Sequence, residues 1–410
     1  MKFDIFFSIC QSQVEEFIPS EQHMLQNFFS QVKLADTLGF ETAWIAESHF
    51  SVQVQKSNPH AVVPHFKGEI GLNPDIFQLA HRIFATTKNI NVGSAIMNLL
   101  CSGGPIAKAE AAKFFMSLHA LDPDEQRKLY LGFAAGRFPY QSAPFGITPR
   151  NEFEQSVWHA LKGKVFLQGT EIFLRLLKGE TLSSDDVRPI VLKASDFRKE
   201  EAWDMAVQAY KDAYDEDLSP QGISFEPFWR FDKLAIVPQD ADLSLLHLVI
   251  GSHDPQAQKM ANEILPCSVF NLSITSEEVI QKTHDNMTDW YHSAGGDWQR
   301  DMMPRTSMIF INNDADASES EKCARAQQQA EKALSCYWEA MEGTVDKKKI
   351  ESAVDNTLCG SPAVIVEQMR ERFHQDDRIM LWFDFNNHDN DDVKNSMKLV
   401  AEHVLPALRS

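Results

Sequence analysis

The chain has 410 residues, of which 43% are apolar and 24% charged, so it has the composition of a globular protein with a large core. Its 39 basic and 58 acidic side chains give a formal net charge of −19. A surface with that charge repels the phosphates of nucleic acids and of anionic lipids, which argues against both as partners.

The sequence shows no signal for export or membrane insertion. Asp4 interrupts the only apolar run near the N-terminus, and no stretch of about 18 apolar residues is present. The six cysteines form no CxxC pair and have no zinc-ligand spacing. We therefore expect reduced thiols, a cytoplasmic location and no bound metal. The acidic tract at 384–392 is more typical of a solvated loop than of a metal site.

Eight short segments rich in β-branched and aromatic residues predict strands. They begin at Phe3, Thr42, Ile90, Lys128, Leu245, Cys267, Thr306 and Arg378.

Amphipathic patterns between these segments predict helices. The first runs from Glu21 to Leu38 and ends at Gly39, because glycine readily takes the left-handed conformation that closes a helix. A second begins near 73–75, with Pro74 in its first turn. Asp254 and Ser361 each precede a proline and predict capped helix starts. Further helices begin near Pro105, Pro149, Ser276, Ser318 and Asp391.

Alternating strands and helices predict a parallel sheet, and eight units favour a closed (β/α)8 TIM barrel, with an open doubly wound sheet as second choice. No GxGxxG follows the first strand. We expect one domain over 1–410. The polar, acid-rich stretch 178–242 predicts a long insertion between the fourth helix and the fifth strand. It is either a lid over the barrel mouth or a dimer-packing or solvent-facing excursion.

In such a barrel the active site lies where the strands end. His49 follows the second strand and is a candidate acid or base, or else a histidine bonded to a loop carbonyl. Ser94 and Ala95 lie in the third strand, where small residues leave room for a flat ligand or simply pack the rim.

The turn after the fifth strand predicts a phosphate pocket. Gly251 permits a tight turn, Ser252 offers a hydroxyl, and the amides from His253 onward open a helix whose dipole favours an anion. Ser252 or Asp254 can also simply cap that helix.

Several segments, taken in order, resemble the bacterial luciferase-like flavin-dependent monooxygenases. These are AWIAESHF, INVGSAIM followed by GGPIAKAE, YLGFAAGRF, VIGSHDPQAQKMA and GSPAVIVEQMRERF. The resemblance covers most of the chain apart from the insertion. It implies a (β/α)8 barrel that binds FMN at its mouth, often with a non-proline cis peptide near Ser94 and Ala95.

The resemblance also implies a two-component reaction. A separate flavin reductase supplies reduced FMN as a co-substrate, O2 forms a C4a-hydroperoxyflavin, and this oxygenates a small organic substrate. His49 matches the catalytic histidine of the family. The residues implied to bind the flavin are Glu47, Ser94, Ala95, Gly251, Ser252 and His253. Ala134 stands where luciferases have a reactive cysteine, so light emission is not expected.

Other readings of the same barrel stay open. It can use a deazaflavin for hydride transfer, or bind flavin without catalysis. An aldolase-type or nucleotide-sugar enzyme would need a lysine or a carboxylate pair at strand ends, and Asp384 is one candidate. The helix after the third strand is rich in alanine, which suits a homodimer through that face or packing on its own barrel. These alanines are Ala107, Ala109, Ala111 and Ala112.

Overall fold

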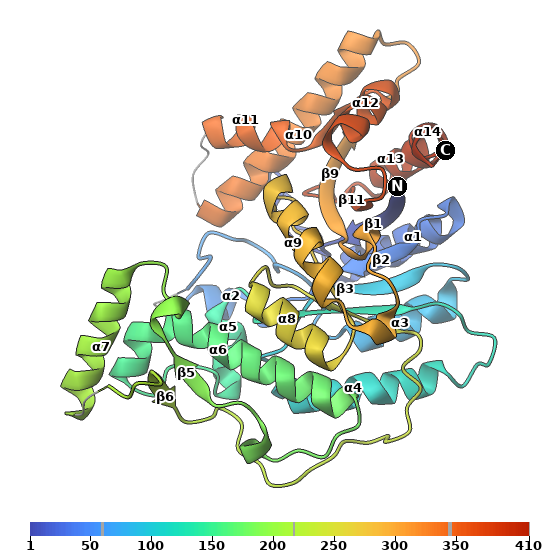
Figure 1. The fold of residues 1–410 in the computed structure, drawn as a ribbon. Helices are drawn as coiled ribbons and strands as arrows, with labels where there is room; N and C mark the ends of the chain where they lie inside the picture. The colour runs from blue at the N-terminus through green and yellow to red at the C-terminus, as the bar shows by residue number, and fades with distance from the viewer. Residues whose placement is uncertain (59–60, 216–217, 343–346, 410) are drawn as a thin grey trace.

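A parallel sheet of nine strands, eight of which close into a ring, forms the centre of the molecule. Figure 1 shows the strands with the helices around them. A computed structural model describes residues 1–58, 61–215, 218–342 and 347–409. All eight predicted strands are present. They are β1 (Lys2–Phe7), β2 (Thr42–Ile45), β3 (Asn91–Asn98), β4 (Leu129–Ala134), β7 (Leu246–Ile250), β8 (Cys267–Val269), β9 (Arg305–Ile311) and β11 (Arg378–Trp382).

The strands follow one another around the ring as the barrel prediction requires. The hydrogen-bonded order is β9-β11-β1-β2-β3-β4-β7-β8, with every pair parallel. Asn271, just after β8, makes a parallel bridge to Arg305 at the start of β9. The Asn271 amide donates to the carbonyl of Pro304 at 2.9 Å, and the amide of Thr306 donates to Asn271 at 3.2 Å. These bonds join the two ends of the sheet.

The helices surround this ring. They are α1 (Glu21–Leu38), α3 (Ile76–Thr86), α4 (Gly104–His119), α6 (Glu152–Leu177), α8 (Pro255–Ile264), α9 (Glu277–Trp290), α10 (Glu319–Glu342), α12 (Pro362–Arg372) and α13 (Asn390–His403).

The predicted helix ends are largely confirmed. Gly39 closes α1 with φ 79°, and the side chains of Asp254 and Ser361 cap α8 and α12. Pro74 is the exception, because it precedes the N-cap instead of lying in the first turn. Asp75 caps α3, and its carboxylate accepts the amide of Phe77 at 2.9 Å.

Short elements escaped the sequence analysis because three or four residues carry no readable period. They are α2 (Gln53–Lys56), α5 (Pro139–Ser142), β10 (Leu358–Gly360), which pairs with the end of β9, and α14 (Leu405–Leu408). The nine-residue α11 (Lys347–Asp355) was also missed.

The segment 178–242 has a small structure of its own, apart from 216–217, which lie outside the described residues. Antiparallel strands β5 (Ile190–Leu192) and β6 (Ile223–Phe225) flank helix α7 (Glu200–Tyr214). The segment lies beside α6 in Figure 1. The Trp229 ring fits against Gly169 of α6, where a Cβ would lie 3.0 Å from it. The segment therefore packs along the outside of the barrel wall.

The described residues contain no helix that is both long enough and apolar enough to cross a lipid bilayer.

Trp44 fills the middle of the barrel. Its side chain is fully buried, and its indole N–H donates to the carboxylate of Asp4 at 2.7 Å. Gly93 on the neighbouring strand makes room for the ring, because a Cβ there would lie 2.5 Å from two ring atoms. The interior is thus closed by one large side chain that requires a glycine opposite it.

We expect Gly93→Ala to destabilise the fold by about 1–3 kcal/mol, because the added methyl overpacks a rigid interior. Gly163→Ala is the control, since a Cβ there meets nothing within 4 Å. Alanine at this exposed position of α6 is expected to be neutral or to stabilise the fold by up to about 1 kcal/mol. Urea unfolding of both variants measures the difference. Equal midpoints would contradict the packing argument.

Candidate active site

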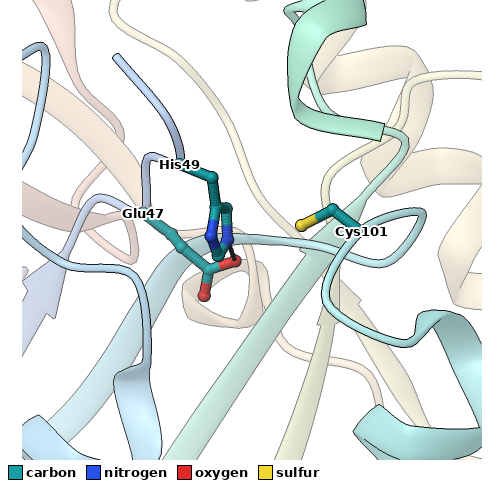
Figure 2. Close-up of side chains that lie close together, drawn as sticks. All are labelled: Glu47, His49 and Cys101. Atoms are coloured by element: carbon teal, nitrogen blue, oxygen red, sulfur yellow. Dashed lines mark hydrogen bonds and ion pairs between the residues drawn. The ribbon is translucent and has the colours of Figure 1, made fainter. Parts of the chain in front are cut away.

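Glu47 and His49 lie together at the carboxyl end of β2 (Figure 2). The Glu47 side chain is fully buried, and its Oε1 accepts the backbone N–H of Asn98 at 3.0 Å. The same oxygen lies 2.8 Å from His49 Nε2 and 3.9 Å from Lys108 Nζ. Glu47 therefore fixes the orientation of the imidazole. It also links the ring to β3 through Asn98 and to α4 through Lys108.

Cys101 is the third member of this cluster, and the sequence analysis missed it. Its sulfur, a His49 nitrogen and a Glu47 oxygen all lie within 4.8 Å of one another (Figure 2). Ser102, Gly103 and Gly104 all have positive φ, at 51°, 87° and 71°. This left-handed turn lets Cys101 reach His49 before α4 begins. The CSGGP segment signals the turn, but not what it would face.

The surroundings of His49 decide its protonation. Burial lowers the pKa of His49, but the hydrogen bonds with Cys101 and Glu47 and their charges outweigh burial, so the pKa rises to about 9. His49 is then an imidazolium at neutral pH, which makes it a proton donor and not a base.

Thiol, imidazole and carboxylate are also ligand types of zinc. Within the described ranges, this is the one group of such side chains close enough to share an ion. Here Glu47 and His49 are already hydrogen-bonded to each other, so two of the three possible ligands are engaged with one another.

Ser94 and Ala95 form the rim beside this cluster, because Ser94 pairs with Ile45 at the end of β2. The Ser94 side chain is fully buried, and its hydroxyl has no hydrogen-bond partner in the described part of the chain. Ala95 is half-buried and faces the barrel interior. The non-proline cis peptide that the resemblance implies is present, between Ala95 and Ile96.

The predicted phosphate turn has the expected local shape. Asp254 caps α8 through the amide of Gln256 at 3.0 Å, while the Ser252 hydroxyl accepts the Asp254 amide at 3.2 Å. That hydroxyl keeps its own hydrogen for a ligand. The His253 ring bonds to the Asn271 side chain at 2.9 Å. Capping by Asp254 and a free hydroxyl on Ser252 therefore coexist.

The backbone amide of Gly251 is not available to a ligand. Its N–H donates to the carbonyl of Phe133 at 2.8 Å, because the residue still belongs to the strand ladder. What it contributes is the missing side chain, since a Cβ would lie 3.2 Å from Ala134 and Ile96. The result is a smooth apolar surface between β3, β4 and β7.

These residues fit a flavin. One buried polar atom at the end of β2, Glu47 Oε2, has no partner among the described residues. Ser94 Oγ also has none, but Ser94 pairs with Ile45 and Leu131 and shares their outward face, away from the barrel interior. Unpaired buried polar atoms are costly, so Glu47 Oε2 indicates a ligand that completes it. The small side chains at Ala95, Ala134 and Gly251 leave space for a flat ring.

Asp384 follows β11 and was the carboxylate considered for an aldolase-type site. Burial raises the pKa of Asp384 to about 7, and Oδ1 has no partner in the part of the chain described. No salt bridge joins it to a lysine of the described ranges. The arrangement therefore gives no support to a lysine–carboxylate mechanism.

Residues 1–121 match the sequence model of the luciferase-like monooxygenases. The matched part contains β1 to β3, α4 and the whole cluster of Glu47, His49 and Cys101. This confirms the family resemblance drawn from the sequence. It also confirms the enzyme class, a flavin-dependent monooxygenase of the luciferase-like type. No curated protein matches the sequence.

Solved structures share the fold over the whole chain. The monooxygenase RslO1 from Streptomyces bottropensis is 19% identical, with 99% of both chains covered and a TM-score of 0.62. The oxygenating constituent of 3,6-diketocamphane monooxygenase from the CAM plasmid of Pseudomonas putida, in complex with FMN, is 15% identical, with 99% and 98% covered and a TM-score of 0.58.

A third solved structure uses another cofactor. The coenzyme F420-dependent tetrahydromethanopterin reductase from Methanopyrus kandleri is 12% identical, with 100% of both chains covered and a TM-score of 0.50. At such identities these likenesses establish the fold, and the predicted (β/α)8 class is confirmed.

We expect Cys101→Ala to lower the pKa of His49 from about 9, because one of the two groups that favour the imidazolium is lost while the burial remains. The imidazole then loses its proton at lower pH than in the unmodified protein. A proton NMR titration of the His49 ring measures the midpoint. Cys267→Ala, at an equally buried cysteine of β8, is the control. An unchanged midpoint in Cys101→Ala would rule out the coupling.

Proposed function

We propose that the protein is the oxygenating component of a two-component FMN-dependent monooxygenase. It takes reduced FMN from a separate reductase and uses O2 to oxygenate a small organic substrate. The arrangement that supports this most is the buried His49, held by Glu47 and Cys101 next to the rim at Ser94, where these neighbours raise the pKa of the ring to about 9. A fixed proton donor beside a flat apolar surface suits flavin chemistry with oxygen.

Each part of the site has a distinct task. Reduced FMN, when bound, supplies the electrons for oxygen activation. Ala95 and Gly251 give the ring a surface, and the hydroxyl hydrogen of Ser252 is available to the phosphate. The amide-rich start of α8 favours the phosphate charge. His49 holds a proton at its ring nitrogens.

Water must be kept out of such a site. The ring centroid of Trp382 lies 4.6 Å from that of Phe6 and 4.7 Å from that of Phe385. These rings give the carboxyl end of the barrel interior an apolar lining. Phe133 of β4 does not contribute to this lining, because it faces outward and packs on Phe173 at 5.3 Å. The lining thus comes from β1 and β11 and not from β4.

A deazaflavin-dependent oxidoreductase is the second candidate, because an F420-dependent reductase shares the fold. Its longer anionic cofactor would be attracted by a basic surface, whereas this chain carries a net charge of −19. FMN is therefore the cofactor we propose. A barrel that binds flavin without catalysis would not need the Glu47–His49–Cys101 cluster.

Rapid mixing tests the proposal. Reduced FMN is bound without air, mixed with oxygenated buffer, and followed by absorbance. We expect reoxidation in more than one phase, with the first phase lost in His49→Ala, because the proton donor is gone. His403→Ala, at an exposed histidine at the end of α13, is the control.

Other outcomes of this experiment discriminate between the candidates. Binding followed by single-phase reoxidation in the unmodified protein would contradict oxygen activation and favour a flavin carrier. No binding of reduced FMN, together with binding of reduced F420, would favour the deazaflavin enzyme. Ser252→Ala is expected to weaken FMN binding more than riboflavin binding, because only FMN carries the phosphate.

We also propose a homodimer through α4. Of the four alanines considered, Ala109 and Ala112 are buried in the protein's own core, Ala111 is half-buried and packs against that core, and Ala107 is exposed. An exposed apolar stripe lies further along the same helix, formed by Phe114 and Leu118 and by Leu121 just after the helix ends. A stripe of this kind is typical of a protein–protein contact.

Phe114→Glu is expected to convert the dimer into a monomer, because it places a charge in the centre of the apolar stripe. Light scattering over a range of concentrations measures the mass. Met205→Glu, at a residue of α7 that is 74% exposed, should leave the mass unchanged. A monomeric unmodified protein at all concentrations would refute the proposed dimer.

A further inference from the structure

The barrel interior is polar near the amino ends of the strands and apolar farther toward their carboxyl ends. Along each strand alternate residues face inward, and near the start of the strands these are polar or charged. The inward-facing set comprises Asp4, Tyr130, His247, Ser268 and Arg378. Apolar side chains, among them Phe6, Val249, Phe270 and Met380, form the next layer with Trp44.

A cavity of about 480 Å³ opens into this polar layer. Trp44 and Tyr130 form its floor, and residues of the 291–304 segment line its side. The volume lies within the usual range of small-molecule sites. Because all strands run in parallel, the cavity is at the opposite end of the barrel from His49 and Ser252. It is therefore a separate site from the one proposed for flavin.

One cation of this cavity has no direct partner. Arg378 pairs with Asp4 at 2.9 Å and with Glu41 at 3.2 Å. Lys2 is paired with Asp301. Lys128 also lines the cavity, but its ammonium has no ion-pair or hydrogen-bond partner in the described ranges. Lys128 is therefore the cation that is available to an anionic ligand.

Two further donors lie beside Lys128. Tyr130 and His247 are direct partners on β4 and β7, with ring centroids at 5.0 Å. Neither side chain forms a hydrogen bond to any described residue. Burial lowers the pKa of His247 to about 4, with further lowering by the charges of Lys128 and Arg378. The imidazole is therefore neutral at pH 7 and lies close to two cations.

We propose that this cavity binds a small monocarboxylate with an apolar body. The carboxylate is held by Lys128, Tyr130 and His247, which supply a charge and two hydrogen bonds. The apolar body lies against Leu177, Leu243 and Leu265, which form the outer wall. A carboxylate fits better than a phosphate, because the remaining wall is apolar and only one cation is unpaired.

Binding is coupled to a proton. Cations face His247 from β4 (Lys128) and β11 (Arg378), and the carboxyl groups of Asp4 and Asp301 pair with Arg378 and Lys2. Burial raises the pKa of Asp4 to about 6, so Asp4 also takes up a proton between pH 7 and 5, and a bound carboxylate raises this pKa too. A bound carboxylate adds a negative charge beside the ring and raises the pKa of His247. The ligand therefore binds more tightly as pH falls from 7 toward 5, with net proton uptake.

Calorimetry with hexanoate tests the proposal on the full chain. Titrations at pH 6 in two buffers of different ionisation enthalpy give both the affinity and the number of protons taken up. We expect saturable 1:1 binding with proton uptake, and much weaker binding of hexanamide, which has the same shape without the charge. Lys128→Met should raise the Kd by at least about tenfold, because the unpaired cation is lost.

Control variants separate binding from stability. Lys33→Met, at an exposed lysine of α1, should leave the Kd unchanged. Tyr130→Phe removes only the hydroxyl and should weaken binding without loss of folding, as checked by circular dichroism. The proposal is overturned if millimolar hexanoate does not bind, if hexanamide binds equally well, or if Lys128→Met leaves the Kd unchanged. None of these outcomes depends on flavin binding.

Discussion

All eight strands of the ring run in the same direction, and this constraint decides which residues can meet. Residues that follow the strands gather at one end of the barrel, and residues that precede them gather at the other. Glu47, Ser94 and Ser252 come from distant parts of the sequence and still reach the same end. By the same rule Asp4, His247 and Arg378 meet at the opposite end. Neither group would exist in a sheet of mixed direction.

The interior between the two ends is closed by apolar packing. Trp44, Phe6 and Met380 belong to one buried cluster inside the barrel, and Gly93 leaves room for the indole. Trp44 also belongs to the polar end, because its N–H bonds to Asp4. Interiors packed in this way are rigid. A ligand at the amino end would therefore affect the carboxyl end through shifts of whole strands and not through a channel.

The strands, most long helices and the position of His49 after β2 could be predicted from the sequence, because these depend on local patterns. The alternation of residues along β4 also predicts that Phe133 faces outward together with Leu129 and Leu131, as it does. Cys101 was not predictable, because its place depends on the three-residue left-handed turn that follows it. The same holds for β5 and β6, which exist only through their pairing with each other.

The state of His49 follows from the whole cluster and not from the histidine alone. The Glu47 side chain is fully buried, and Lys108 approaches it only to 3.9 Å, so the histidine is its closer partner. Buried charges persist when they are paired, which favours an imidazolium beside this carboxylate. Cys101 on the other side adds a second acceptor for the ring. A histidine at the mouth of a barrel can act as acid or base, and in this chain the neighbours supplied by β2, β3 and α4 make it an acid.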